Sequence, residues 1–169
     1  MSLYETAKYE VLEKDGKFEI REYDSFYTAA VSESDPIDTN GFGDIFGYIS
    51  GDNVSKEKIS MTTPVMNELE EKKYTTEFVM PSKYKDVSPP KPMNENITIK
   101  RREKRQCAAV TFNGSVYKEK IQKNEEELLK WLSKINRVPE GTFRLARYNP
   151  PFTPPPLKRN EILIDVIPE

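Results

Sequence analysis

The chain has 169 residues but no histidine, and it has a single cysteine, Cys107. The absence of histidine excludes Ser-His-Asp and Cys-His catalysis, and also zinc or haem iron held by an imidazole. One cysteine cannot form a disulfide within the chain. The single cysteine favours a reducing, cytoplasmic setting, and the missing histidine restricts any site to other side chains.

Long apolar runs and a strong excess of charge are also missing. No apolar segment approaches the roughly 20 residues that span a bilayer, and the net charge is −2. The basic run at residues 100–105 has no interleaved aromatic residues, so it is read as a solvated turn rather than an RNA site. We therefore expect no membrane and no nucleic-acid partner, and the length predicts one domain over residues 1–169.

Alternating apolar and polar residues predict a series of short strands. Asp15-Gly16 is a strong two-residue turn between the first two strands, which predicts a hairpin. Residues 59–66 are expected to pair with residues 74–80, and residues 97–101 with residues 106–113. The predicted strands cover residues 9–13, 18–23, 26–32, 59–66, 74–80, 97–101, 106–113, 142–148 and 162–167.

Two segments have helical periodicity instead. In the first, residues 42, 45, 46 and 49 place large apolar side chains on one face, and Gly51 supplies a left-handed stop. The second helix has its apolar face within residues 128–135. It begins either near Tyr117 or at a capping box formed by Asn124 and Glu127.

The order of these elements suggests two halves of similar pattern, about residues 9–81 and 95–167, each approximately β-α-β-β. Antiparallel strands with two amphipathic helices predict an α+β fold. The sensible packing is a curved antiparallel sheet or distorted β-barrel with two flanking helices.

Several short blocks carry more specific information. They are Tyr9-Glu10-Val11-Leu12, Ile20-Arg21-Glu22-Tyr23, Gly41-Phe42 through Tyr48-Ile49-Ser50-Gly51-Asp52-Asn53, Lys58-Ile59-Ser60-Met61-Thr62-Thr63-Pro64-Val65, Phe78-Val79-Met80-Pro81, Tyr148-Asn149-Pro150-Pro151 and Arg159-Asn160-Glu161-Ile162. In this order and spacing, from about residue 9 to residue 167, the chain resembles the SOUL/haem-binding protein family.

The resemblance implies a protein that binds haem or another tetrapyrrole. It also implies a distorted antiparallel β-barrel with two flanking helices, similar to the effector-binding domains of GyrI- and AraC-type regulators. Some members of the family hold the iron with a histidine, which this sequence cannot do. What carries over is the hydrophobic mode, in which the porphyrin lies against the first helix and near the proline-rich loop. The implied binding residues are Phe42, Ile45, Phe46, Ile49, Lys158 and Arg159.

The chemistry of a porphyrin fits these residue types. Phe42 and Phe46 could stack on the ring, while Lys158 and Arg159 could pair with the propionates. A core role for the helix face, and a structural ion pair between Arg159 and Glu161, are the alternatives. Within the helix we expect Phe42 to be partly exposed, and Phe46 and Ile49 to lie in the core. An iron ligand, if any, would come from Met61, Met66, Tyr48, Tyr148 or Cys107.

Two other functions stay open. A GyrI-like small-molecule effector binder or hydrolase would use a desolvated ionisable group, and the candidates are Glu77, Tyr48, Tyr148 and Glu161. A protein-interaction module would use the prolines of residues 150–156. The expectation we adopt is a monomeric tetrapyrrole-binding protein with no catalytic residue and no metal site.

Overall fold

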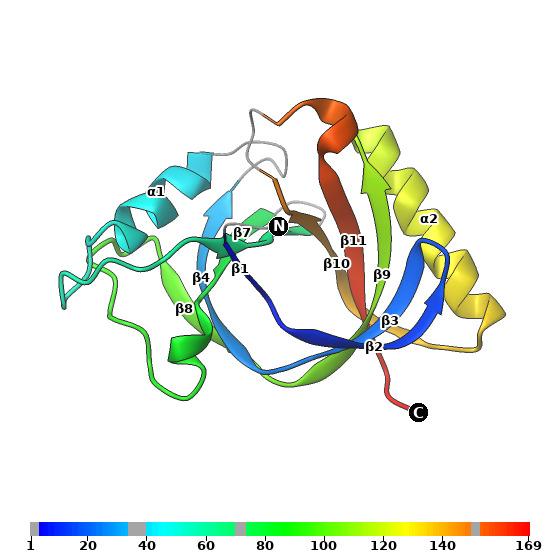
Figure 1. Ribbon diagram of the computed structural model, residues 1–169, viewed down its shortest axis with the longest axis horizontal. Helices are drawn as coiled ribbons and strands as arrows, with labels where there is room; N and C mark the ends of the chain where they lie inside the picture. Colours follow the sequence, from blue (N-terminus) through cyan, green and yellow to red (C-terminus); the bar gives the residue numbers. More distant parts are fainter. Residues whose placement is uncertain (1–3, 34–39, 70–73, 150–152) are drawn as a thin grey trace. The chain divides into compact units, whose positions relative to one another are not determined.

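The structure is a computed structural model that describes residues 4–33, 40–69, 74–149 and 153–169. Its contacts divide the chain into two compact units. The first unit is formed by Met1–Ala7 with Ser25–Glu103, and the second by Lys8–Asp24 with Lys104–Glu169. Both units combine antiparallel strands with an α-helix (Figure 1).

The first unit contains an antiparallel sheet with the strand order β6-β7-β4-β8. A short parallel pair, β1 with β5, forms a separate two-stranded sheet. The elements are β1 (Glu5–Thr6), β4 (Phe26–Glu33), α1 (Asn40–Ile49), β5 (Thr62–Thr63), β6 (Val65–Leu69), β7 (Tyr74–Val79), the 3₁₀ turn η1 (Ser82–Tyr84) and β8 (Thr98–Arg102).

The second unit contains an antiparallel sheet with the order β2-β3-β9-β11-β10. Helix α2, yellow in Figure 1, packs along β9, β10 and β11. The elements are β2 (Tyr9–Asp15), β3 (Phe18–Tyr23), β9 (Arg105–Asn113), α2 (Lys118–Lys134), β10 (Pro139–Arg147), the 3₁₀ turn η2 (Pro155–Leu157) and β11 (Arg159–Val166).

Most predicted strands and their local turns are confirmed. The first hairpin pairs β2 with β3 around Gly16, whose φ of 61° suits glycine. The predicted pairing of residues 59–66 with residues 74–80 is confirmed in part, since β6 pairs with β7 but residues 59–61 are not in a strand. β10 pairs with β11. Gly51 follows α1 with a φ of 122°, as a left-handed stop requires.

The predicted hairpin of residues 97–101 and 106–113 is wrong. β8 pairs with β4 of the first unit, whereas β9 lies between β3 and β11 of the second. The boundary between the units falls after Glu103, in the two-residue link between the strands. A short polar link therefore does not form a hairpin when the strands on its two sides pair with strands of different units.

The start of α2 resolves a question that the sequence left open. The helix begins at Lys118 with Tyr117 as its N-cap, so Asn124 is not a capping residue. Asn124 is buried inside the helix, and its Nδ2 donates to the Lys120 carbonyl at 2.8 Å. Phe18 of β3 stacks on Trp131 with ring centroids 5.3 Å apart, which fixes α2 on its sheet.

Candidate functional site

Helix α1 buries one narrow face against the first sheet. Ile45 and Tyr48 are fully buried, and Ile49 is nearly so. These side chains join Ala29 of β4 and Phe78 of β7 in a single core cluster. The expectation that Ile45 and Ile49 could serve the core is confirmed, and Tyr48 belongs to the same face.

The aromatic residues of α1 lie away from the centre of that face. Phe46 is 58% exposed, and Phe42 is half-buried. Their ring centroids are 6.4 Å apart with an interplanar angle of 36°. The partial exposure predicted for Phe42 is confirmed, but the prediction that Phe46 lies in the core is wrong.

The reason is the angular position of each residue around the helix. At about 100° per residue, Ile49 lies about 40° to one side of Ile45 and Tyr48 about 60° to the other. Phe46 lies about 100° from Ile45, beyond the edge of the buried face. Its exposure gives α1 an aromatic surface that the core does not use.

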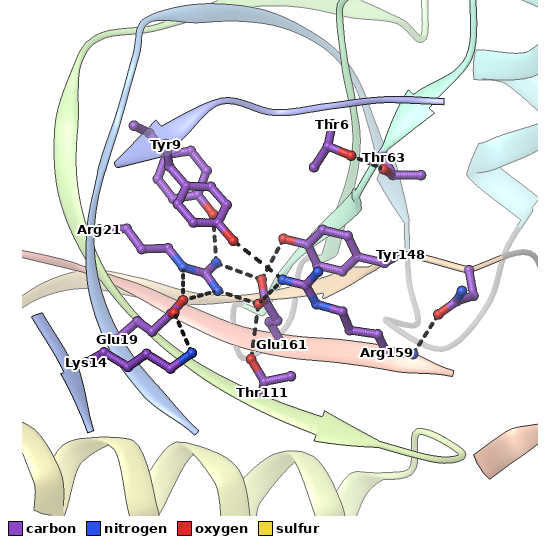
Figure 2. Close-up of polar contacts among 12 residues, drawn as sticks. Thr6, Tyr9, Lys14, Glu19, Arg21, Thr63, Thr111, Tyr148, Arg159 and Glu161 are labelled. Atoms are coloured by element: carbon purple, nitrogen blue, oxygen red, sulfur yellow. Dashed lines mark hydrogen bonds and ion pairs between the residues drawn. The ribbon is translucent and has the colours of Figure 1, made fainter. Parts of the chain in front are cut away.

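In the second unit, Glu161 of β11 is the centre of a buried polar network (Figure 2). Arg21 of β3 donates from Nη1 and Nη2 to the two carboxylate oxygens at 2.8 and 2.5 Å. Tyr148 donates its hydroxyl at 2.6 Å, Thr111 at 3.1 Å, and Arg159 donates from Nη2 at 3.0 Å. The carboxylate therefore accepts hydrogen bonds from four side chains.

These contacts determine the charge state of the network. Burial by itself would raise the pKa of Glu161, but the hydrogen bonds and charge of Arg21, with Tyr148 and Arg159, lower it to about 2. Burial raises the pKa of Tyr148 well above its ordinary value, and the charge of Glu161 adds to this. At neutral pH the carboxylate is thus ionised and the phenol neutral, which suits a positioning network rather than proton transfer.

Arg159 lies at the rim of this network and Lys158 beside it. The guanidinium of Arg159 stacks over the Tyr148 ring at 4.2 Å, and its side chain remains 43% exposed. Its backbone N–H donates to Asn149 Oδ1 at 2.6 Å, which ties β11 to the start of the proline-rich loop. The ion pair between Arg159 and Glu161, considered from the sequence, is present. Lys158 is half-buried.

The predicted binding residues thus divide between the units. Phe42, Ile45, Phe46 and Ile49 belong to the first unit, and Lys158 and Arg159 belong to the second. A protein-interaction module would use the prolines of residues 150–156. Of these, residues 150–152 lie outside the described residues, and Pro154–Pro156 are exposed.

Sequence reasoning missed Arg21 as the main partner of Glu161. The strand pattern places Glu19, Arg21 and Tyr23 on the polar side of β3, which normally faces water. In the structure Arg21 is only 1% exposed, and its Nη1 also donates to the Tyr23 oxygen at 2.9 Å. The Ile20-Arg21-Glu22-Tyr23 block was the available signal, but the pattern of hydrophobicity gave no hint of burial.

The ionisable groups considered for catalysis all have partners. Tyr48 donates its hydroxyl to the Pro90 carbonyl at 2.6 Å. Glu77 is paired with Arg102 in the first unit, while Tyr148 and Glu161 belong to the network above. Arg21 lowers the pKa of Glu161 to about 2, so this carboxylate is a weak general base.

The candidate iron ligands are mostly inaccessible. Cys107 and Met66 are buried, and burial raises the pKa of the Cys107 thiol to about 11. Met61 is half-buried against the α1 core. Within the described residues, no group of three or more His, Cys, Asp or Glu side chains is placed to hold a metal ion.

Known proteins of similar sequence identify the family of this chain. The sequence profile of the SOUL heme-binding protein family matches residues 4–165. The chain is 28% identical to heme-binding protein 2 of Homo sapiens over 151 residues, which are 80% of this chain and 72% of that protein. It is 31% identical to heme-binding protein 2 of Mus musculus over 153 residues, with 81% and 72% covered. The chain belongs to the SOUL heme-binding protein family.

A solved structure extends the comparison to the fold. A hydrolase from Listeria innocua superposes with a TM-score of 0.65 at 11% identity, covering 92% of this chain and 94% of that chain. At that identity the similarity concerns the fold alone. It confirms the predicted α+β class, in which antiparallel strands combine with two helices. None of the described helices has the length and apolar character that crossing a membrane requires.

Proposed function

We propose that the protein binds haem or a related tetrapyrrole through apolar contacts with α1, without an axial histidine. Phe46 carries this proposal, because a large aromatic side chain that is 58% exposed has no role in the core. With Phe42 beside it, the helix offers a pair of rings to a flat apolar ligand. Family membership supports a tetrapyrrole as that ligand.

The residues fit the ring of a porphyrin better than they fit its iron. The chain has no histidine, and Tyr48 and Tyr148 already donate their hydroxyls to other groups. Cys107 and Met66 are buried, which leaves Met61 as the half-buried candidate. We therefore expect metal-free protoporphyrin to bind about as well as hemin.

Hemin titration tests the proposal. The expected result is a saturable shift of the Soret band with the unaltered protein. Phe46→Ala should weaken binding about tenfold, because a buried phenyl ring contributes about 1.5 kcal/mol or more. Leu129→Ala, which truncates an exposed apolar side chain on α2, should leave binding unchanged. Absence of saturation at concentrations well above micromolar, or equal effects of the two substitutions, overturns the proposal.

A separate prediction concerns the propionates of the ligand. Lys158 and Arg159 belong to the second unit and α1 to the first, so the sequence-based pairing of these two cations with the propionates stays a prediction. Hemin titration of Arg159→Gln tests it. Weaker binding that is no longer seen when both propionates are esterified supports the pairing, and unchanged binding contradicts it.

The alternative of a hydrolase is not favoured, because each candidate catalytic group is already engaged. The expected monomeric state, cytoplasmic location and lack of a nucleic-acid partner remain predictions. Size-exclusion chromatography of the purified protein, with and without hemin, tests the first of them.

A further inference from the structure

One strand of the first unit presents a buried hydroxyl to the face of its sheet that α1 does not cover. Side chains alternate along a strand, so Ala29 and Val31 of β4 join the α1 core while Thr28 points the other way. Thr28 is fully buried, and its Oγ1 has no hydrogen-bond partner among the described residues. A buried hydroxyl without a partner is costly, and such groups call for an explanation.

The strand register surrounds this hydroxyl with charged side chains. Lys100 of β8 lies directly opposite Thr28, whereas Arg102 lies two residues along, opposite Phe26. Glu77 of β7 lies on the other side of β4, opposite Ala30. Cross-strand neighbours share a face of the sheet, so these side chains gather around Thr28.

An ion pair bridges β4 at this position. Arg102 donates from Nη2 to Glu77 Oε1, and from Nε to Oε2 at 3.3 Å. Because the two residues flank Thr28 diagonally on opposite sides of β4, their contact crosses the strand at Thr28. Lys100 Nζ is 3.8 Å from Glu77 Oε1, which is ion-pair distance but too long for a hydrogen bond.

The cluster of Thr28, Glu77, Lys100 and Arg102 has more positive charge and more hydrogen-bond donors than the Glu77 carboxylate uses. Lys100 and Arg102 supply two positive charges against the single negative charge of Glu77. No hydrogen bond is formed with a described residue by the Thr28 hydroxyl, the Lys100 ammonium or Arg102 Nη1. Glu77 is only 2% exposed, while the side chains of Arg102 and Lys100 are 19% and 38% exposed, so the two cations lie nearer the surface than Glu77 and Thr28.

We propose that Thr28, Lys100 and Arg102 form a binding site for the carboxylate group of a small organic acid. Glu77 acts as a positioning residue, since it holds Arg102 across β4. A carboxylate carries the single negative charge that matches the surplus, and its two oxygens can accept from the hydroxyl, the ammonium and the guanidinium. The site lies on the sheet face opposite the α1 core, so it does not depend on the proposed tetrapyrrole binding.

Benzoate is a suitable probe, with benzyl alcohol as its uncharged counterpart. In a ¹H–¹⁵N NMR titration of the full chain, benzoate should give saturable shifts at the amides of Thr28, Ala30 and Lys100. Benzyl alcohol should give none, because the site recognises the carboxylate. No saturation with benzoate, or the same shifts with both compounds, overturns the proposal.

Two substitutions identify the groups that bind. Lys100→Met keeps the apolar stem and should weaken benzoate binding about tenfold, the effect expected for losing a charge-assisted hydrogen bond. Thr28→Val removes the hydroxyl with little change of shape, so the protein should fold at least as stably yet bind benzoate more weakly. Lys104→Met is the matched control, since Lys104 pairs with Glu22 of the second unit at 3.2 Å. Unchanged affinity in both Thr28→Val and Lys100→Met contradicts the assignment.

Discussion

Arg21 and Glu161 form a two-point ion pair inside the second sheet, although 140 residues separate them in the sequence. Their side chains are 1% and 0% exposed. A pair of charges at this depth is compatible with folding because each oxygen of Glu161 also accepts from a neighbouring hydroxyl. The pair therefore links β3 and β11, the two strands that flank β9.

Breaking this pair should be far more harmful than removing it whole. We expect Arg21→Met to lower the free energy of unfolding by about 3–5 kcal/mol, because Glu161 loses its main partner while still buried. The double variant Arg21→Met/Glu161→Leu should lose much less than the sum of the single variants. Urea unfolding measures both. Lys17→Met, which removes an exposed pair with Glu127, is the control and should cost less than about 1 kcal/mol. Additive losses would show that the pair is not coupled.

The same carboxylate predicts how stability depends on acid. The folded pKa of Glu161 is lowered to about 2 from an ordinary value of 4.5. A group whose pKa is lower in the folded state stabilises the protein above its unfolded pKa, and this contribution is lost as the pH falls from about 4.5 towards 2. Melting temperatures across this range should fall less steeply for Glu161→Gln than for the unaltered protein. If the melting temperatures of the two proteins fall equally with pH, the acid sensitivity comes from other groups.

Two neighbouring positions on α1 should respond oppositely to truncation. Ile45→Ala removes a fully buried side chain and should cost about 2–5 kcal/mol. Phe46→Ala should change the free energy of unfolding by less than about 0.5 kcal/mol, because the ring is mostly exposed. The urea unfolding midpoints of the two variants measure this difference in stability. A large loss of stability in Phe46→Ala would mean that the ring packs against the protein, and the proposed contact with a ligand would lose its basis.

Cys107 should behave as an inert thiol in the folded protein. It is fully buried, and burial raises its pKa to about 11, so little thiolate is present at neutral pH. A thiol reagent that forms a coloured product should react very slowly without denaturant and rapidly in urea. Fast reaction in native buffer would reveal opening of the second sheet around β9.

Much of the local structure follows from the sequence because its causes are local. Asp15-Gly16 predicts the first hairpin, and the spacing of Ile45 and Ile49 predicts the buried side of α1, since turn conformation and helical periodicity depend on near neighbours. The short blocks of the sequence also determine the family. None of these features depends on distant contacts.

The partners of the strands outside the local hairpins, and the depth of each polar residue, were decided only by the tertiary structure. β8 and β9 are separated by two residues yet belong to different units, because β8 pairs with β4 whereas β9 pairs with β3 and β11. Arg21 lies on the face of β3 that the sequence pattern assigns to solvent. Its burial is tolerated because Glu161, near the other end of the sequence, pairs with it. The burial of such charged side chains depends on pairing between residues that are distant in the sequence, and hydrophobic periodicity does not indicate that pairing.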